Sequence, residues 1–431
     1  MNKIFDIIQS NRAGHGKGIY AVCTAHQMVL EAALRQGKKD GSPVLIEATA
    51  NQVNQFGGYT GMTPADFVPY IESIAKKVGF PAADIILGGD HLGPVVWCEE
   101  SALDAMAKAR DLVASYVRAG FKKIHLDTSM ACADDPIELD DDLVARRAAE
   151  LCEVAERTAI ECFAQSDLLY VVGTEVPPPG GATEAMDNLQ VTPVSAVMKT
   201  VQAHKTEFLD RGLSDAWSRV VGLVVQPGVE FNHSSVHNYQ SAESVNLSAL
   251  IRDLPNMVYE AHSTDYQAPS AYLELVRDHF AILKVGPQLT FALREVLFAL
   301  SHIEDALVAE RQRSNLREQC ELIMLENPKS WQRYYPSEEP QGQLCRRYSY
   351  SDRIRYYWND PAIEGATAQL IANLEALDIP PPLLNQYLPQ QYTALRAGEL
   401  LSSPKSLIQH YIMQVTACYA AACLGAACLG E

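Results

Sequence analysis

Short apolar runs recur over the first two thirds of the chain, and most end at glycine or a polar residue. Helical spacing of apolar residues appears between them, for example at 102–119, 143–158 and 193–211. Eight of the runs are rich in β-branched residues, which is typical of buried strands: 19–23, 44–48, 85–87, 123–126, 169–173, 220–225, 257–260 and 281–285. Apolar strands that alternate with helices indicate a parallel sheet covered on both faces. The pattern therefore predicts an α/β fold, a (β/α)8 TIM barrel within residues 1–305.

The main alternative is a doubly wound open sheet, which would need a glycine-rich phosphate loop directly after an early strand. The one candidate, Gly14-His15-Gly16-Lys17-Gly18, precedes the first predicted strand instead of following it. It also lacks the spacing of a P-loop, so nothing in the sequence resembles an ATP site. The barrel is therefore favoured over the open sheet.

The alternation of strands and helices stops after residue 305. Tyrosine, tryptophan and arginine are frequent between 334 and 358, and helical patterns return at 366–377 and 405–418. These features predict a C-terminal, mainly helical extension over residues 306–431 that packs on the barrel. Aromatic residues and arginine are also enriched at protein interfaces, so a partner-binding surface is an equal alternative.

Composition narrows the class of protein. The chain has 431 residues, of which 48% are hydrophobic, enough for a large buried core. A formal charge of −18 argues against a nucleic-acid partner, whose phosphates attract basic surfaces.

The ten cysteines are scattered without a CxxC pair, which predicts reduced thiols. No signal peptide is visible at the start, and the Ala- and Cys-rich stretch 413–429 is short for a membrane span. We expect a soluble, cytoplasmic protein without a membrane partner.

Polar residues gather at the predicted strand ends, which in a parallel barrel meet at one mouth. His91, Glu175 and His262 follow three different strands. A divalent metal needs about three nitrogen or oxygen ligands from converging elements, so these three residues are the predicted ligands. His125 falls inside the fourth predicted strand, and we interpret it as a structural, hydrogen-bonded imidazole.

Asp90 directly precedes His91 and follows two glycines. A carboxyl group beside a polarised carbonyl can give or take a proton, so Asp90 is the candidate proton donor. Glu47 and Asp127 are further catalytic candidates, and for each acid the alternative is that it only orients an imidazole. If the strand continues, Asp90 and His91 point to opposite sides; if the chain turns at Gly89, they lie together.

The loops after the last two strands offer candidate substrate-binding groups. Ser263 and Asp265 follow the seventh strand, and Lys284 and Gly286 lie at the end of the eighth. Backbone N–H groups of such loops can cradle a phosphate. The negative charge of Asp265 and the missing N–H of Pro287 argue against a phosphate here, and ordinary loop geometry is the alternative.

Several long segments together resemble one known family. They are 45–49, 51–64, 86–94, 173–177, 225–231, 260–267, 280–295, 350–358 and 386–389. They are similar to the GatZ/KbaZ family, the Z subunits of D-tagatose-1,6-bisphosphate aldolase, and the resemblance covers nearly the whole chain. That family is related to class II aldolases, which are zinc enzymes with a TIM-barrel fold.

The resemblance implies roles for particular residues. Asp90 and His91 match the proton donor and a zinc ligand of the catalytic aldolases, and His262 resembles the last zinc ligand. The middle ligand is a histidine in those enzymes, whereas the comparable strand end here offers Glu175. Two segments depart from the aldolase phosphate loops: Ser263-Thr264-Asp265 and Lys284-Val285-Gly286-Pro287.

The family resemblance also implies a function. The Z subunit is inactive alone and supports the activity and stability of the catalytic Y subunit, in a chaperone-like way, during tagatose 6-phosphate degradation in galactitol or amino-sugar catabolism. A divalent metal, foremost zinc, and a homo-oligomer are also expected. The alternative is a stand-alone, metal-dependent aldolase or epimerase that acts on a sugar or sugar phosphate.

Overall fold

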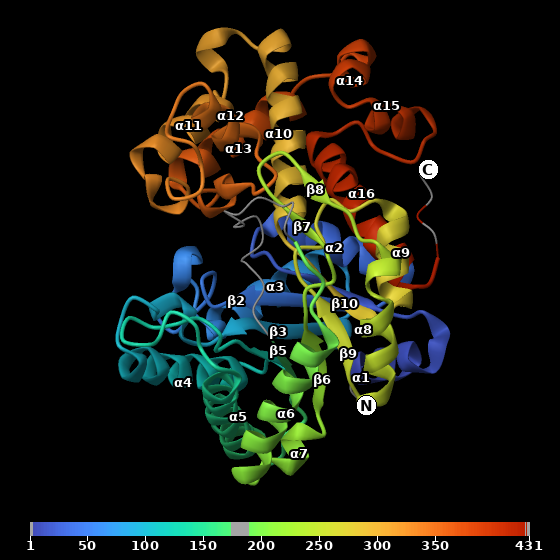
Figure 1. Cartoon of the computed structure of the whole chain (residues 1–431). Helices are drawn as coiled ribbons and strands as arrows, with labels where there is room; N and C mark the ends of the chain where they lie inside the picture. The colour runs from blue at the N-terminus through green and yellow to red at the C-terminus, as the bar shows by residue number, and fades with distance from the viewer. Residues whose placement is uncertain (1–2, 174–188, 427, 429–431) are drawn as a thin grey trace.

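The computed structural model describes residues 3–173, 189–426 and 428. In these residues eight parallel strands close into a barrel in the order β1-β2-β3-β4-β5-β6-β9-β10 (Figure 1). The ring closes because β10 pairs with β1, with Ile282 opposite Ile19 and Val285 opposite Val22. The predicted TIM barrel is confirmed, and the doubly wound sheet is excluded because an open sheet has no such closing pair.

All eight strands lie where the apolar runs predict them. They are β1 (Ile19–Val22), β2 (Val44–Thr49), β3 (Ile85–Leu92), β4 (Lys123–Leu126), β5 (Leu169–Gly173), β6 (Val220–Val224), β9 (Val258–Ala261) and β10 (Phe280–Val285). The main difference concerns β3, which we predicted to end at Leu87 and which continues to Leu92. Glycine is required at position 88 of this extended strand because a Cβ there would lie 2.8 Å from the Glu47 side chain.

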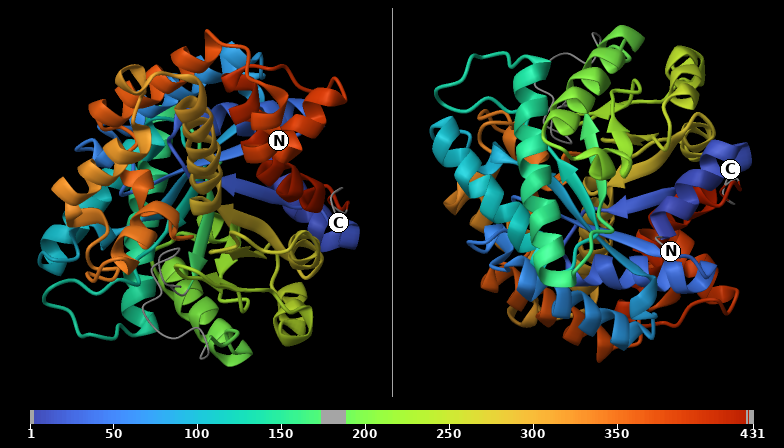
Figure 2. Two further views of the ribbon diagram at one scale, coloured as in Figure 1. Left: turned by 90° about the horizontal axis from the view of Figure 1, so that it is seen from above. Right: turned by 90° about the horizontal axis from the view of Figure 1, so that it is seen from below.

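Helices follow the strands and cover the outside of the barrel (Figure 2). Local sequence fixes their ends: Thr63 and Asp66 form a capping box at the start of α3, and Gly79 ends it with φ 70°. The helices are α2 (Gln27–Asp40), α3 (Pro64–Val78), α4 (Ala102–Arg118), α5 (Asp141–Phe163), α6 (Val194–Asp210), α7 (Ser214–Trp217), α8 (Val245–Leu250), α9 (Pro269–Arg277) and α10 (Pro287–Leu307). A short hairpin, β7 (Glu230–Phe231) and β8 (Val236–His237), lies between β6 and α8.

The barrel interior is layered along its axis. Near the amino ends of the strands it is apolar, and helix α1 (Lys3–Ser10) packs its fully buried Ile4 and Ile8 against it. We call these strand residues the lower layer: Ile19, Leu45, Ile86, Leu169, Val221, Val258 and Ile282. Side chains alternate along a strand, so the next inward-facing position lies two residues on. There the interior becomes charged, in what we call the charged layer: Glu47, Lys123, Glu260 and Lys284.

The C-terminal extension is helical, as predicted, and lies against one end of the barrel (Figure 1). It contains α11 (Leu316–Glu326), α12 (Gln341–Tyr348), α13 (Pro361–Glu375), α14 (Pro381–Tyr387), α15 (Pro389–Arg396) and α16 (Pro404–Cys423). Helix α16 packs along α2, α9 and α10, and its Tyr419 hydroxyl donates to the Thr264 carbonyl at 2.9 Å. Helix α10 ends at Leu307, and the division of the chain at residue 305 stays a prediction.

Two findings concern the end of the chain. A disulfide joins Cys418 and Cys428, so the prediction that all cysteines are reduced is wrong for this pair. The sequence did not indicate it because disulfide pairing depends on how the chain folds back after a helix. Among the described residues, no helix has the length and apolar character needed to cross a bilayer.

Candidate metal centre

The carboxyl end of β3 places Asp90 and His91 in the barrel mouth together. The register with β4 shifts between Gly89 and Leu92, and His91 has φ 49°. A bulge of this kind re-aims side chains, and a left-handed residue other than glycine often marks a functional site. The strand therefore continues, as one of our two alternatives has it, but the bulge turns both side chains inward.

Three imidazoles surround one point at the mouth. The ring centroids of His91, His125 and His262 lie 4.8 Å, 5.0 Å and 5.3 Å apart. Together with Asp90, they offer one ligand atom each within 4.8 Å of one another. The three histidines come from β3, from β4 and from the residue after β9. This geometry brings together four possible ligands for one metal ion.

Each imidazole has a carboxylate partner. His91 Nδ1 lies 2.6 Å from Asp127 Oδ2, His125 Nδ1 lies 3.0 Å from Asp90 Oδ1, and His262 Nε2 lies 3.0 Å from Glu260 Oε1. Carboxylates in this position fix the orientation of a ligating imidazole and leave its other nitrogen for a metal. Three imidazoles supported in this way, together with the carboxylate of Asp90, fit Zn²⁺ or a similar divalent ion.

The electrostatics of the site favour ionised acids. Burial disfavours the charged form of His91, but Asp90 and Asp127 outweigh it and raise the pKa of His91 to about 9. Burial dominates at His262 and lowers its pKa to about 4. Burial also opposes ionisation of Asp127, but the hydrogen bond and charge of His91 hold the Asp127 pKa below its usual range.

The charged layer lies directly beneath these ligands. Lys123 Nζ lies 2.6 Å from Glu47 Oε1 and 2.7 Å from Glu260 Oε2, and all three side chains are fully buried. Lys284 pairs with Glu47 and, at 2.5 Å, with Asp90 Oδ1. Burial opposes the charge of Asp90, but Lys284 and His91 outweigh it and hold the Asp90 pKa well below its usual range.

Cys23, Glu47 and Asp90 form a second group of possible ligands. The ammonium group of Lys284 already contacts both carboxylates of this group. Its charge already stands where a metal ion would bind these two carboxylates, whereas three of the four ligands in the other group are histidines that Lys284 does not pair with, so a metal ion fits the histidine group better. Lys284 and Glu47, which we predicted as substrate-binding and catalytic residues, are thus paired with each other inside the barrel.

The two predicted substrate loops are hydrogen-bonded to each other. Asp265 Oδ1 accepts hydrogen bonds from the backbone N–H groups of Gly286, at 3.1 Å, and Gln288, at 2.8 Å. These donors lie at the start of α10, where a barrel enzyme often holds a phosphate. Burial raises the pKa of Asp265 to about 6. The neighbouring Ser263 is buried, with φ 52°. The carboxylate of Asp265 thus uses the N–H groups that a phosphate would need.

The structure brings several of the predicted site residues together and does not describe one of them. The structure brings Asp90, His91 and His262 together, with Asp127 behind them, whereas Glu175 lies outside the described residues. Sequence reasoning missed His125, which faces the same point. A signal was present, since Lys123, His125 and Asp127 alternate and so share one face of their strand.

Comparison with known proteins identifies the family. The model of the D-tagatose-1,6-bisphosphate aldolase subunit GatZ/KbaZ-like family matches residues 4–424. The chain belongs to this family. A probable tagatose 6-phosphate kinase from Sinorhizobium meliloti 1021 is 45% identical, with a TM-score of 0.87 over 94% of this chain and 100% of that chain. The match with that protein extends over both the barrel and the extension.

Two aldolase structures are similar to this GatZ/KbaZ-like chain at a lower level. The YdjI aldolase from Escherichia coli K12 is 12% identical, with a TM-score of 0.43 over 84% of this chain and 94% of that chain. The fructose-bisphosphate aldolase from Campylobacter jejuni is 15% identical, with a TM-score of 0.44 over 86% and 91%.

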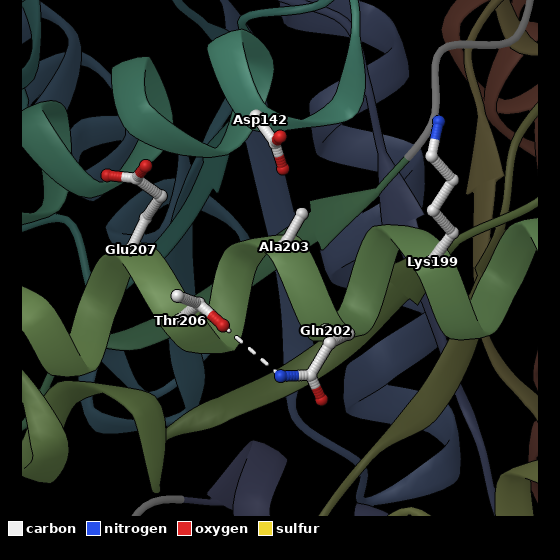
Figure 3. A pocket seen from close by; sticks show the side chains of 6 residues that line it. All are labelled: Asp142, Lys199, Gln202, Ala203, Thr206 and Glu207. Carbon is white, nitrogen blue, oxygen red and sulfur yellow. Dashed lines mark hydrogen bonds between the residues drawn. The ribbon is translucent and has the colours of Figure 1, made fainter.

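Two hollows elsewhere on this GatZ/KbaZ-like chain contain none of the predicted site residues. One, of about 250 Å³, lies between α5 and α6, with Asp142, Lys199 and Glu207 at its edges (Figure 3). The other, of about 330 Å³, lies between α1, the end of α2 and the end of α16. Neither gathers buried polar groups as the barrel mouth does, so the mouth is the candidate functional site.

Proposed function

We propose that this chain is the non-catalytic component of a class II D-tagatose-1,6-bisphosphate aldolase, and that it supports the activity and stability of the catalytic Y subunit. The family match supports a place in that aldolase. The hydrogen bonds of Asp265 to Gly286 and Gln288 support the absence of independent catalysis. A bisphosphate substrate needs free donors for its phosphates, and these two donors are already used.

The metal centre belongs to this proposal as a retained feature of the barrel. His91, His125, His262 and Asp90 would hold the ion, for which zinc is our first choice. When bound, such an ion polarises a carbonyl oxygen. Asp127 and Glu260 orient two of the imidazoles by hydrogen bonds. Asp90 is tied to Lys284 and His125, and these contacts compete with the proton transfer that an aldolase would require of it.

The second candidate is a stand-alone metal-dependent aldolase or epimerase acting on a sugar or sugar phosphate. One observation favours it: a buried cluster of three imidazoles lies at the carboxyl ends of the strands, where barrel enzymes keep their chemistry. In that function the ionised Asp90, which Lys284 favours, would take up a proton from the substrate and return it later in the same turnover.

Cleavage of D-tagatose 1,6-bisphosphate, measured with zinc present, separates the two functions. The purified chain alone should show no cleavage, and its addition to the catalytic Y subunit should raise activity and slow inactivation of that subunit. Cleavage by the chain alone that His91→Ala abolishes would establish the second function instead.

The same variant tests what the metal centre does in the mixture. If His91→Ala still supports the Y subunit, the centre has no catalytic task. His15→Ala, at an exposed position before β1, is the matched control and should behave as the wild type. Metal analysis of the same samples should show about one ion per chain in the wild type and in the control.

A further inference from the structure

The extension sends one segment, residues 349–358, across loops of the barrel mouth. Its Tyr350 N–H donates to the His233 carbonyl at 3.0 Å, and its Tyr350 carbonyl accepts from the Tyr266 hydroxyl at 2.6 Å. The Tyr356 ring lies 5.1 Å from the Tyr59 ring, between centroids. The segment therefore contacts the loops after β6, β9 and β2 at once.

Two arginines on this segment have no carboxylate partner among the described residues. Arg355 donates to the carbonyls of Ser351 and Asp352, and to the Tyr356 hydroxyl at 3.0 Å. Arg353 donates to the Ser330 carbonyl, and its guanidinium carbon lies 3.5 Å from the centre of the Tyr334 ring. Aromatic rings and carbonyls hold both groups in place, but they bring no negative charge.

Two neighbouring arginines of the extension differ in this respect. Arg346 and Arg347 both pair with Glu321, at 2.7 Å and 3.1 Å. The nearby carboxylate of Asp352 acts electrostatically on Arg355, but its own partners are Arg294 and Thr290. Among the described residues, Arg311 and Arg396 also have no carboxylate partner, but both are exposed to solvent, whereas Arg353 is buried and Arg355 is partly buried.

The positive charges of Arg353 and Arg355 meet at one phenol. Their guanidinium carbons lie 5.2 Å and 4.6 Å from the centre of the Tyr356 ring. Burial opposes ionisation of Tyr356, but the two guanidiniums outweigh it and lower the Tyr356 pKa below its usual range. Buried charges are costly unless they are compensated, so two guanidiniums that both border the Tyr356 ring favour binding of an anion.

We propose that Arg353, Arg355 and Tyr356 form an anion site at the rim of the barrel mouth, which takes the phosphate group of a phosphorylated sugar. Planar guanidiniums present paired donors that match phosphate oxygens. The position complements the start of α10, where Asp265 already fills the usual place for a phosphate. The site needs neither a metal nor the Y subunit, so it stands or falls separately from the function proposed above.

Calorimetric titration of the full chain, without added metal, tests this site. The probes are inorganic phosphate, D-tagatose 6-phosphate and D-tagatose. Inorganic phosphate and D-tagatose 6-phosphate should bind, and D-tagatose should not. A lower dissociation constant for D-tagatose 6-phosphate than for phosphate would show that the sugar is also recognised. Arg355→Met and Arg353→Met should each weaken binding by about tenfold, the value of one charge-assisted hydrogen bond.

Two further variants keep the result interpretable. Arg355→Lys retains the charge without the planar fork and should fall between the wild type and Arg355→Met, which guards against a methionine variant that fails to fold. Arg396→Met is the matched control, because Arg396 also lies over a ring, that of Tyr392 at 5.8 Å, in another part of the extension. Absence of phosphate binding, or unchanged binding in both methionine variants, would overturn the proposal.

Discussion

The lower layer and the charged layer of the barrel are built by largely the same strands, two residues apart. Leu45 is followed by Glu47 on β2, Val258 by Glu260 on β9, and Ile282 by Lys284 on β10. On each of these three strands, the inward-facing side chain two residues further on is charged instead of apolar, and it is buried as well. The two layers have the same scaffold but obey different rules of stability.

The side chains of an apolar layer only have to fill the space available, whereas each charge in a buried charged layer needs its oppositely charged partner. Hydrocarbon side chains tolerate conservative changes, because their attraction is not directional. A buried ion that loses its partner costs several kcal/mol, because no water replaces that partner. The charged layer is therefore expected to be the less tolerant of the two, although the lower layer buries more apolar surface.

Lys123→Met should have the largest effect. It leaves Glu47 Oε1 and Glu260 Oε2 without the ammonium that lies 2.6 Å and 2.7 Å from them. We expect a loss of about 3–5 kcal/mol in the free energy of unfolding, measured by urea denaturation. Lys122→Met is the control, since its pair with Asp167 is exposed and contributes about 1 kcal/mol at most. Equal effects of the two variants would contradict the distinction between the layers.

Ile282→Ala examines the lower layer in the same assay. It removes buried carbon atoms from the apolar cluster that also contains Leu45 and Val258, with an expected loss of about 2–4 kcal/mol, and Ile282→Val should lose only about 1 kcal/mol. Zinc affinity, measured by competition with a chelator, should not change in either variant. A zinc affinity that falls together with stability would show that the two layers do not act separately.

The sequence predicted the lower layer better than the mouth, for a physical reason. Short apolar runs determine where buried strands begin, and every strand of the barrel lies at a predicted run. The carboxyl ends of parallel strands meet, and this rule alone brought His91 and His262 together. Neither inference requires the position of any single side chain.

What the sequence left open depends on local geometry. The bulge in β3 places Asp90 and His91 side by side, and no propensity of Gly88 or Gly89 specifies it. His125 was assigned a structural role because it falls within a strand, although alternation with Lys123 points it into the barrel. The pairing of Asp265 with the start of α10 appears only once the chain is folded.

Asp265 is a buried acid without a basic partner among the residues that the structure describes, unlike the paired acids of the charged layer, and its contribution to stability should therefore depend on pH. Its folded pKa, about 6, lies above the unfolded value near 3.8, so the folded state binds the proton more tightly. This contribution to stability is complete below about pH 4 and is lost as the pH rises through 6. The loss is at most about 3 kcal/mol.

Asp265→Asn isolates this contribution, because asparagine stays neutral and still offers an oxygen to Gly286 and Gln288. The free energy of unfolding should be measured for the wild type and the variant at two pH values. The value for the variant minus that for the wild type should be larger at pH 7 than at pH 4.5. A difference that is the same at both pH values would show that Asp265 titrates as it does in the unfolded chain.

The mildest change, Asp127→Asn, acts on the mouth without removing a ligand. Asp127 Oδ2 lies 2.6 Å from His91 Nδ1, and asparagine keeps the shape of the side chain while it loses the charge that orients and strengthens the imidazole. Partners of this kind change metal affinity by about 10–100-fold when altered, so zinc should bind that much more weakly. Asp111→Asn, at an exposed position of α4, should leave the affinity unchanged. Stability without metal should fall far less than in Lys123→Met, because asparagine can still accept a hydrogen bond from His91, whereas methionine leaves two buried carboxylates without their ammonium partner. A variant that loses stability as Lys123→Met does, yet binds zinc normally, would place Asp127 with the charged layer and not with the metal centre.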